Sequence, residues 1–309
     1  MDYSTPSEFV DFLKRTRSQP YAPGDRQEDF DAITKRDLEK QGIPFEAGSK
    51  GIENLEGIIL QLFDEILKAQ PAEIQRATEH SIGVGVMETG LVNAFIANGG
   101  GGCYAVIVNS GLMILLNKAI KLWVGASREG GITYCNRKPA EELSKSDIHE
   151  MLHELFFIYR ETGIPRGPMV KVSDECLGIY SMALHIAEAF VVCHELGHYL
   201  NGDLNSDSGL ASLPWCDGVE YYKGDSNHEK EHNADITGYG LLQRFVREKH
   251  SSLDADFLMF GIVTVMDMIG AISAEGSPTH PDAKDRVVRI AQHFYGDEEA
   301  ERWKASYKN

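Results

Sequence analysis

The sequence predicts an α+β protein that is mostly helical and contains one small antiparallel sheet. Two observations lead to this fold class. Over most of the chain, apolar residues recur at the spacing of an amphipathic helix. One stretch, residues 82–109, differs because glycine-rich turns separate short runs of β-branched residues. With 309 residues, the chain is long enough to bury a sizeable core.

The N-terminal part is predicted to be helical and carries no motif for chemistry. Helices are expected at residues 7–17, 25–41, 53–67 and 71–80. In the third of these, the apolar residues form one broad face. We therefore predict a helical extension over residues 1–75, followed by one larger domain over residues 76–309.

Three strands are expected in the sheet. They are predicted at residues 82–86, 91–97 and 104–108. The turn before the third strand holds four glycines, and because no Gly-Lys-Ser/Thr follows, it is not a phosphate-binding loop. Two interpretations of this hairpin stay open. It is either a flexible tip or an edge strand whose unpaired backbone groups hold an extended peptide.

The remainder of the chain is predicted to be helical. Helices are expected at residues 111–126, 140–162, 176–201, 227–249, 252–275, 282–294 and 297–306. Residues 127–175 are interpreted as a helical insertion. The loop from 202 to 226 is rich in Gly, Ser, Asp and Asn. Its Trp215, Tyr221 and Tyr222 either shape substrate pockets or form a small aromatic cluster on the surface.

The helix expected at 176–201 carries the main chemical motif, His194-Glu195-x-x-His198. Residues four apart lie on the same face of a helix, so both imidazoles can bind one metal ion. Catalytic zinc takes three protein ligands and leaves one position for water. Glu195 follows the first histidine and can accept a proton from that water as general base. The motif therefore predicts a zinc-dependent hydrolase.

The same pattern occurs a second time, at His149–His153. Asp147 precedes this copy and Glu154 follows it, which is typical of a charged, solvated helix face. The stretch from 191 to 200 has no charged residue except Glu195, as expected for a helix buried beneath a cleft. We therefore assign the metal to the later copy and interpret the earlier one as two ordinary surface histidines.

A third ligand is expected from the helix that follows the loop. Glu231 and Asp235 are four residues apart and share a helix face. Glu231 would complete a His2Glu site, and Asp235 would hydrogen-bond the second ring nitrogen of a ligand histidine. The neighbouring His228, Glu229 and His232 compete as ligands. His232 follows Glu231 directly, so it points about 100° away from it on a helix.

Two other metal motifs are excluded after His198. A calcium loop starting at Asp203 would need Gly at its sixth position and Glu at its twelfth, where the chain has Ser208 and Pro214. The pattern H-E-x-x-H-x-x-G-x-x-H/D would need a ligand at 204, where the chain has leucine. The sequence therefore gives Asp203 no role.

These residues resemble a known family. The order H-E-x-x-H followed by E-x-x-x-D resembles the gluzincin metallopeptidases, the thermolysin-like group. Asn93-Ala94-Phe95, the glycine turn and the stretch 106–112 resemble the corresponding region of the CAAX-prenyl-endopeptidase and HtpX-like family. The stretch 279–286 resembles its THPxxxxR element.

The resemblance implies a gluzincin-like core, in which the small sheet packs on the metal-binding helix, and zinc as cofactor. It implies that Asn93 touches the substrate backbone, although a turn-capping asparagine is the alternative. His280 would stabilise the oxyanion, or else cap the next helix, and Arg286 would orient the substrate or the loop. The chain departs from the family in its long insertion, and many family members are embedded in membranes.

Composition bounds the partners. The net charge of −17 argues against binding to nucleic acid or to anionic membranes. The five cysteines, without any C-x-x-C, indicate reduced thiols, with Cys193 packed in the core. The N-terminus shows no signal peptide. Residues 257–274 are apolar, but Asp267 in their middle favours a core helix over a membrane span. We expect a cytoplasmic protein without stable membrane insertion; the sequence indicates no oligomeric state.

Three functions stay open at this stage. The favoured one is a zinc endopeptidase that acts on a protein or peptide. A selective protease of the kind that cleaves one host protein during phage exclusion is one form of this function. The second is a non-catalytic zinc module with a structural or sensory role. Glu195 argues against it, since a structural site closes its fourth position. The third is a metal-dependent hydrolase of a non-peptide amide.

Overall fold

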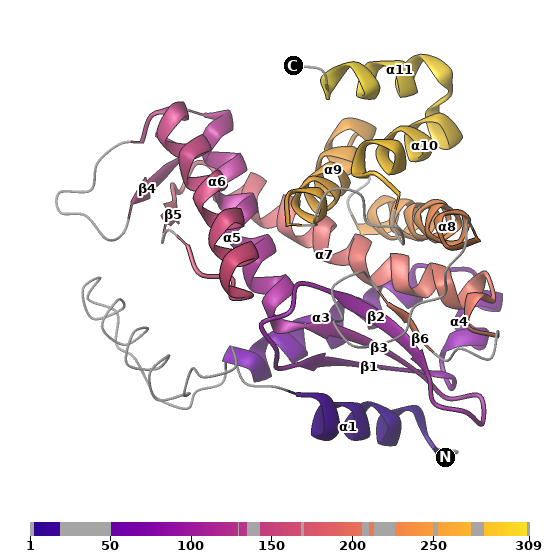
Figure 1. Cartoon of the computed structure of the whole chain (residues 1–309). Helices are drawn as coiled ribbons and strands as arrows, with labels where there is room; N and C mark the ends of the chain where they lie inside the picture. The colour runs from indigo at the N-terminus through magenta and orange to yellow at the C-terminus, as the bar shows by residue number, and fades with distance from the viewer. Residues whose placement is uncertain are drawn as a thin grey trace.

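The computed structural model of the chain confirms a mostly helical α+β fold (Figure 1). It describes residues 3–18, 51–128, 130–134, 143–167, 170–205, 210–212, 226–249, 253–272 and 281–307. Three expectations lie outside these residues: the helix at 25–41, the aromatic residues of the loop 213–225, and His280.

The elements follow the predicted order closely. The helices are α1 (Pro6–Arg17), α3 (Gly51–Lys68), α4 (Ala72–Thr78), α5 (Ser110–Ser127), α6 (Lys145–Thr162), α7 (Leu177–Leu200), the 3-10 turn η1 (Asp203–Asn205), α8 (Ser226–Lys249), α9 (Ala255–Ile272), α10 (Ala283–Tyr295) and α11 (Asp297–Ser306). The strands are β1 (Ile82–Met87), β2 (Ala94–Asn98), β3 (Tyr104–Asn109), β4 (Ile132–Tyr134), β5 (Val170–Val172) and β6 (Leu210–Ser212).

The main sheet is mixed, which corrects the prediction of an antiparallel sheet. Its strand order is β1-β3-β2-β6, with β1 parallel to β3 and β2 antiparallel to both β3 and β6. The parallel pair arises because the chain passes from β1 to the far side of β3 before it turns back. A second, two-stranded sheet, β4-β5, was not predicted.

Strand β2 is not an edge strand along Phe95–Ala97, which argues against one of the two open interpretations of this hairpin. Its residues Phe95, Ile96 and Ala97 pair with β3 on one side. On the other side the same residues pair with β6, which comes from the loop between the two predicted ligand helices. A peptide therefore finds no free edge on this part of β2.

Helix α1 and helix α7 cover opposite faces of the main sheet (Figure 1). Phe9, Val10 and Leu13 of α1 pack on Phe95 and Ile107. The glycines of this region make the packing possible. A Cβ on Gly83 would lie 2.8 Å from the carbonyl oxygen of Pro6, and one on Gly99 would lie 2.7 Å from the ring of Phe9.

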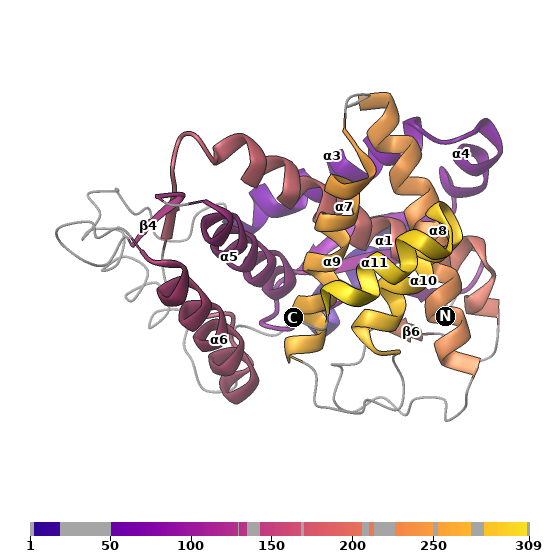
Figure 2. The same cartoon turned by 90° about the horizontal axis from the view of Figure 1, so that it is seen from above.

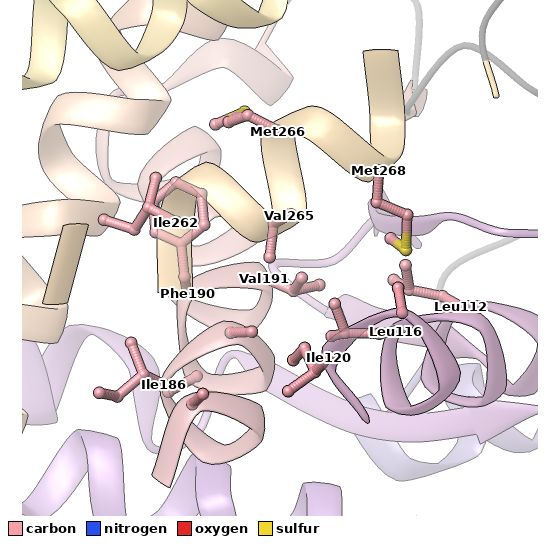
Figure 3. Packing of buried hydrophobic residues seen from close by; sticks show 14 of the residues in the cluster. Leu112, Leu116, Ile120, Ile186, Phe190, Val191, Ile262, Val265, Met266 and Met268 are labelled. Atoms are coloured by element: carbon pink, nitrogen blue, oxygen red, sulfur yellow. The ribbon is translucent and has the colours of Figure 1, made fainter. Parts of the chain in front are cut away.

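The hydrophobic core lies where α5, α7 and α9 meet. In Figure 3, Leu112 and Leu116 of α5 face Met268 of α9, and Phe190 and Val191 of α7 lie near Val265. Figure 2 shows α6 on the far side of α5, away from α8, α10 and α11. Ile59, Leu62 and Ile66 of α3 join the same core, so the segment expected as an N-terminal extension contributes to it.

Helices α7 and α9 are long and apolar enough to cross a membrane by length and composition alone. The core helix of a soluble protein passes the same test, so this is weak evidence. Asp267, which argued against a span, is half-buried in α9. The described cysteines, including Cys193 as expected, are free and buried.

Candidate metal centre

The candidate site forms where α7 and α8 pack closely side by side (Figure 1). Two glycines allow this approach. A Cβ on Gly197 of α7 would lie 2.6 Å from the carbonyl oxygen of Ala234 of α8. A Cβ on Gly238 of α8 would lie 2.9 Å from the Cα of His194. Side chains from the facing turns of the two helices therefore meet in a narrow buried space.

The three predicted ligands converge in this space. Glu231 Oε2 lies 3.6 Å from His194 Nε2, and Glu231 Oε1 lies 3.5 Å from His198 Nε2. The three ligand atoms all lie within 4.8 Å of one another, and all three residues are buried. They are the only group of three His, Cys, Asp or Glu residues so arranged in the described part of the chain.

The spacing and chemistry of these atoms fit a zinc ion. Separations of 3.5 and 3.6 Å are too long for hydrogen bonds. Ligand atoms on a tetrahedral zinc, with bonds of about 2.0–2.2 Å, stand roughly 3.4 Å apart. In addition, His194 Nε2 is buried and makes no hydrogen bond among the described residues. Two imidazole nitrogens and one carboxylate are the donors that catalytic zinc sites use.

Asp235 and Arg286 lie behind His194. Asp235 Oδ1 is 3.0 Å from His194 Nδ1. The Arg286 guanidinium donates to both oxygens of Asp235, at 2.7 and 2.6 Å, and its Nη2 lies 3.6 Å from Glu231. Burial alone would raise the pKa of Asp235, but Arg286 and His194 together outweigh burial and hold that pKa below its ordinary value. Asp235 is therefore a carboxylate in close ion-pair contact with the His194 ring.

Arg286 is buried behind the ligands, where its Nε and Nη2 donate to Asp235, while its Nη1 makes no hydrogen bond among the described residues. Its side chain is 2% exposed, and α10 brings it to the back of the ligand set. The expectation that it orients substrate or the loop stays a prediction. What the structure adds is a contact that the sequence did not indicate, a two-pronged ion pair between Arg286 and Asp235.

Glu195 lies between the ligands and the sheet. Its carboxylate accepts from the backbone N–H of Ile96 in β2. Burial raises the pKa of Glu195 above its ordinary value, although His194 and His198 oppose this. Glu195 also lines an apolar pocket with His194, Arg286, Phe190, Val191, Val265, Met266 and Ile269. The predicted base therefore faces a small space with mostly apolar walls.

Asn93 belongs to a buried polar network at the start of β2. The side-chain amide of Asn109 donates to the carbonyl oxygen of Asn93 at 3.1 Å and to its side-chain oxygen. Thr89 donates to Asn109 at 2.7 Å, and the N–H of Val92 donates to the hydroxyl of Tyr159 in α6 at 2.9 Å. Asn93 is 0% exposed. Its predicted contact with a substrate stays a prediction.

The competing ligands do not join the cluster. His232 is buried outside it, and burial lowers its pKa. Glu229 is exposed. In the earlier copy of the motif, His149 and His153 are both exposed on α6. The structure thus brings His194, His198, Glu231 and Asp235 together and leaves these alternatives apart.

The sequence missed Asp203. Its Oδ2 lies 2.9 Å from Nδ1 of His198, the counterpart of the contact between Asp235 and His194. Residues five apart do not share a helix face, so helical spacing gave no signal for this contact. The signal that could have indicated it is the Asn201-Gly202 pair, a helix stop that reverses the chain.

One comparison with known proteins bears on this site. Residues 163–306 match the family model described as Peptidase U49, which covers just under half of the chain. No curated protein matches the chain, and no solved structure does. The matched span contains α7 to α11, and with them the ligand set, Glu195 and Arg286. The matched span begins after α6, so the earlier copy of the motif, His149–His153, lies outside it. The match supports peptidase activity.

Proposed function

We propose that the chain is a zinc-dependent endopeptidase whose ion is held by His194, His198 and Glu231. The observation that carries this proposal is the convergence of these three buried side chains within a span that matches a peptidase family. When bound, zinc acts as a Lewis acid that makes water a nucleophile near neutral pH.

Glu195 is the general base in this proposal. It neighbours His194 in the chain and faces the same pocket. A carboxylate with a raised pKa is a stronger base, so Glu195 accepts the proton of the attacking water. It then returns this proton to the leaving amine as the peptide bond breaks. Asp235 keeps the Nδ1 proton of His194 in place, so that its Nε2 lone pair faces the ion.

The pocket beside Glu195 supports a substrate class. Its apolar walls come from Phe190, Val191, Val265, Met266 and Ile269, and the rest of its lining from His194, Glu195 and Arg286. We propose that these apolar walls contact an apolar residue next to the peptide bond that is cut. The substrate is then a protein or peptide, as the family match supports, rather than a small amide. A cytoplasmic location and zinc as cofactor belong to the same proposal.

The test is the zinc content per chain, measured by plasma emission spectrometry, together with cleavage of denatured casein. Wild type and the His149→Ala variant are expected to hold one zinc and to cleave, and His194→Ala is expected to lose both. Zinc retained in His194→Ala but lost in His149→Ala would show that the metal lies on α6 and that the proposal places it on the wrong helix. Zinc without cleavage of any peptide would favour the non-catalytic module.

A further inference from the structure

Asp203 stands on the far side of His198 from the proposed ion. Its Oδ2 is 2.9 Å from Nδ1 of His198, whereas Nε2 of the same ring is 3.5 Å from Glu231. The imidazole therefore separates Asp203 from the ligand cluster. Because the ring lies between them, Asp203 is not itself a ligand. Whatever it does for the site, it does through His198.

The turn after α7 brings Asp203 into this position. On a continued helix, residue 203 would lie about 140° around the axis from His198. The helix instead ends at Leu200, and Gly202 adopts φ 75°, in the left-handed region that favours glycine. The N–H of Gly202 donates to the carbonyl of Tyr199 at 3.1 Å, which closes the turn. The reversed chain then presents Asp203 to the ring of His198.

Two further contacts hold the turn from outside. The Lys230 ammonium donates to the backbone carbonyl of Asp203 at 3.3 Å. Lys230 precedes Glu231 in α8, so one helix both supplies the third ligand and anchors Asp203. The side-chain amide of Asn98, the last residue of β2, donates to the carbonyl of Leu204 at 3.4 Å. The backbone of η1 is thus fixed between α8 and the sheet.

The carboxylate partners of the two histidines differ in the other ion pairs that they form. Asp235 shares its charge between His194 and the bidentate Arg286. For Asp203, His198 is the one ion-pair partner within the described residues. A carboxylate on Nδ1 fixes the tautomer of a histidine and raises its basicity at Nε2. That effect is largest where no other cation neutralises the carboxylate.

We propose that Asp203 is a positioning residue that fixes His198 as a metal ligand, an inference that rests on the proposed zinc site. The chain then holds each histidine by a separate carboxylate, Asp235 from α8 for His194 and Asp203 from η1 for His198. Asp203 keeps the proton on Nδ1 and directs the Nε2 lone pair of His198 toward the ion.

The test is the zinc affinity of the whole chain, measured by competition with a chelating dye. Loss of such an outer partner weakens metal binding by about 10–100-fold, so Asp203→Ala should fall in this range. In Asp203→Asn the amide oxygen still accepts from Nδ1 but lacks the charge, so a loss of about 10-fold is expected. The exposed Asp174, replaced in Asp174→Ala, is the matched control and should bind zinc as wild type does.

Two readouts separate this role from a purely structural one. A purely structural Asp203 would lower the melting temperature of the metal-free chain and leave the affinity of the folded chain unchanged. The proposed role predicts weaker zinc binding together with altered visible absorption of the cobalt(II)-loaded Asp203→Ala chain. Wild-type affinity in Asp203→Asn overturns the proposal, whether or not Asp203→Ala folds. If wild type itself binds no zinc, the proposed function falls as well.

Discussion

Helices α6 and α7 carry the same pattern, His-Glu-x-x-His, in opposite surroundings. On α6 the two histidines and Glu150 face solvent. On α7 the corresponding residues are buried, with His194 3% and His198 4% exposed. Helix α6 packs on α5 and α9, whereas α7 contacts the sheet, α5, α8 and α9.

The difference between the two copies lies in the partners that their surroundings supply. The histidines of α7 meet Glu231, Asp235 and Asp203, which come from two other elements. Among the described residues, no such group gathers around His149 and His153. A five-residue pattern thus defines which atoms can bind a metal. Whether these atoms bind a metal depends on how other elements pack around the motif. Several elements surround the copy on α7, whereas the copy on α6 faces solvent.

The largest effect is expected at the central glutamates. Glu195→Gln should retain zinc and lose cleavage of denatured casein by roughly 10²–10⁴-fold, since the general base is removed. Glu150→Gln, at the same place in the α6 copy, should cleave as wild type does. Both rates are measured beside zinc content. Equal rates of cleavage by Glu195→Gln and wild type would contradict the role of Glu195 as general base.

The next effect concerns the ligand that only the α7 copy has. Glu231→Gln should weaken zinc binding by more than the roughly 100-fold that the loss of an outer partner costs, because a direct charged ligand is lost. Glu154→Gln, beside the α6 copy, should leave the affinity unchanged. Dye competition measures both. Normal zinc binding by Glu231→Gln would mean that the third ligand is a different residue.

A third prediction compares buried and exposed ion pairs. Arg286→Met removes the bidentate cation from buried Asp235 and leaves His194 as its remaining partner, so the free energy of unfolding should fall by about 3–5 kcal/mol. Arg302 pairs with Asp256 and Glu299 on the surface, with its side chain 52% exposed. Arg302→Met should cost less than about 1 kcal/mol. Urea unfolding of the two variants gives the comparison; similar losses would contradict it.

Glu188 of α7 is buried, and this predicts a pH dependence of the free energy of unfolding that the exposed acidic residues of α6 should not cause. Burial raises the pKa of Glu188 from 4.5 to about 7. The folded state therefore prefers the neutral carboxyl, and the free energy of unfolding should fall as pH rises from 4.5 to about 7. At pH 8, Glu188→Gln should be more stable than wild type by about 2–3 kcal/mol, and at pH 4 this advantage should vanish.

The control for this prediction is again on α6. Glu154 is exposed, so Glu154→Gln should change the pH dependence of unfolding little. Urea unfolding of the metal-free chains at pH 4, 6 and 8 measures both variants. A pH profile of Glu188→Gln that follows wild type at every pH would show that Glu188 is not the group responsible.

The smallest effect is expected from the α6 histidines. Replacement of both His149 and His153 by glutamine leaves helix propensity and burial nearly unchanged. The free energy of unfolding should therefore shift by less than about 0.5 kcal/mol. Zinc content should stay at one ion per chain. Loss of zinc in this double variant would give the α6 copy a role that its surroundings do not explain.

Much of the candidate site follows from local periodicity. His194, His198, Glu231 and Asp235 were each found from a spacing of four on a helix, and such spacing is a property of sequence alone. Asp203 was missed because its contact depends on how α7 stops at Gly202. The pairing of Arg286 with Asp235 was missed because it depends on where α10 lies relative to α8.

The sheet shows the same division. The strands β1, β2 and β3 were found from their β-branched runs, near their observed bounds. Their order was not, because parallel pairing of β1 with β3 depends on the path of the chain between them. β6 has only three residues, too few for a pattern, and its pairing with β2 joins segments more than a hundred residues apart.

The packing of α1 on a glycine-containing face of the sheet has a consequence for the solubility of the protein. That face has Phe95 and Ile107 as its apolar side chains, and at Gly83 and Gly85 it offers bare backbone. A chain that begins after α1 would expose the apolar side chains of this face to water. Such a truncated protein would be expected to self-associate through the exposed face. Helix α1 is therefore expected to protect the protein against aggregation through this face.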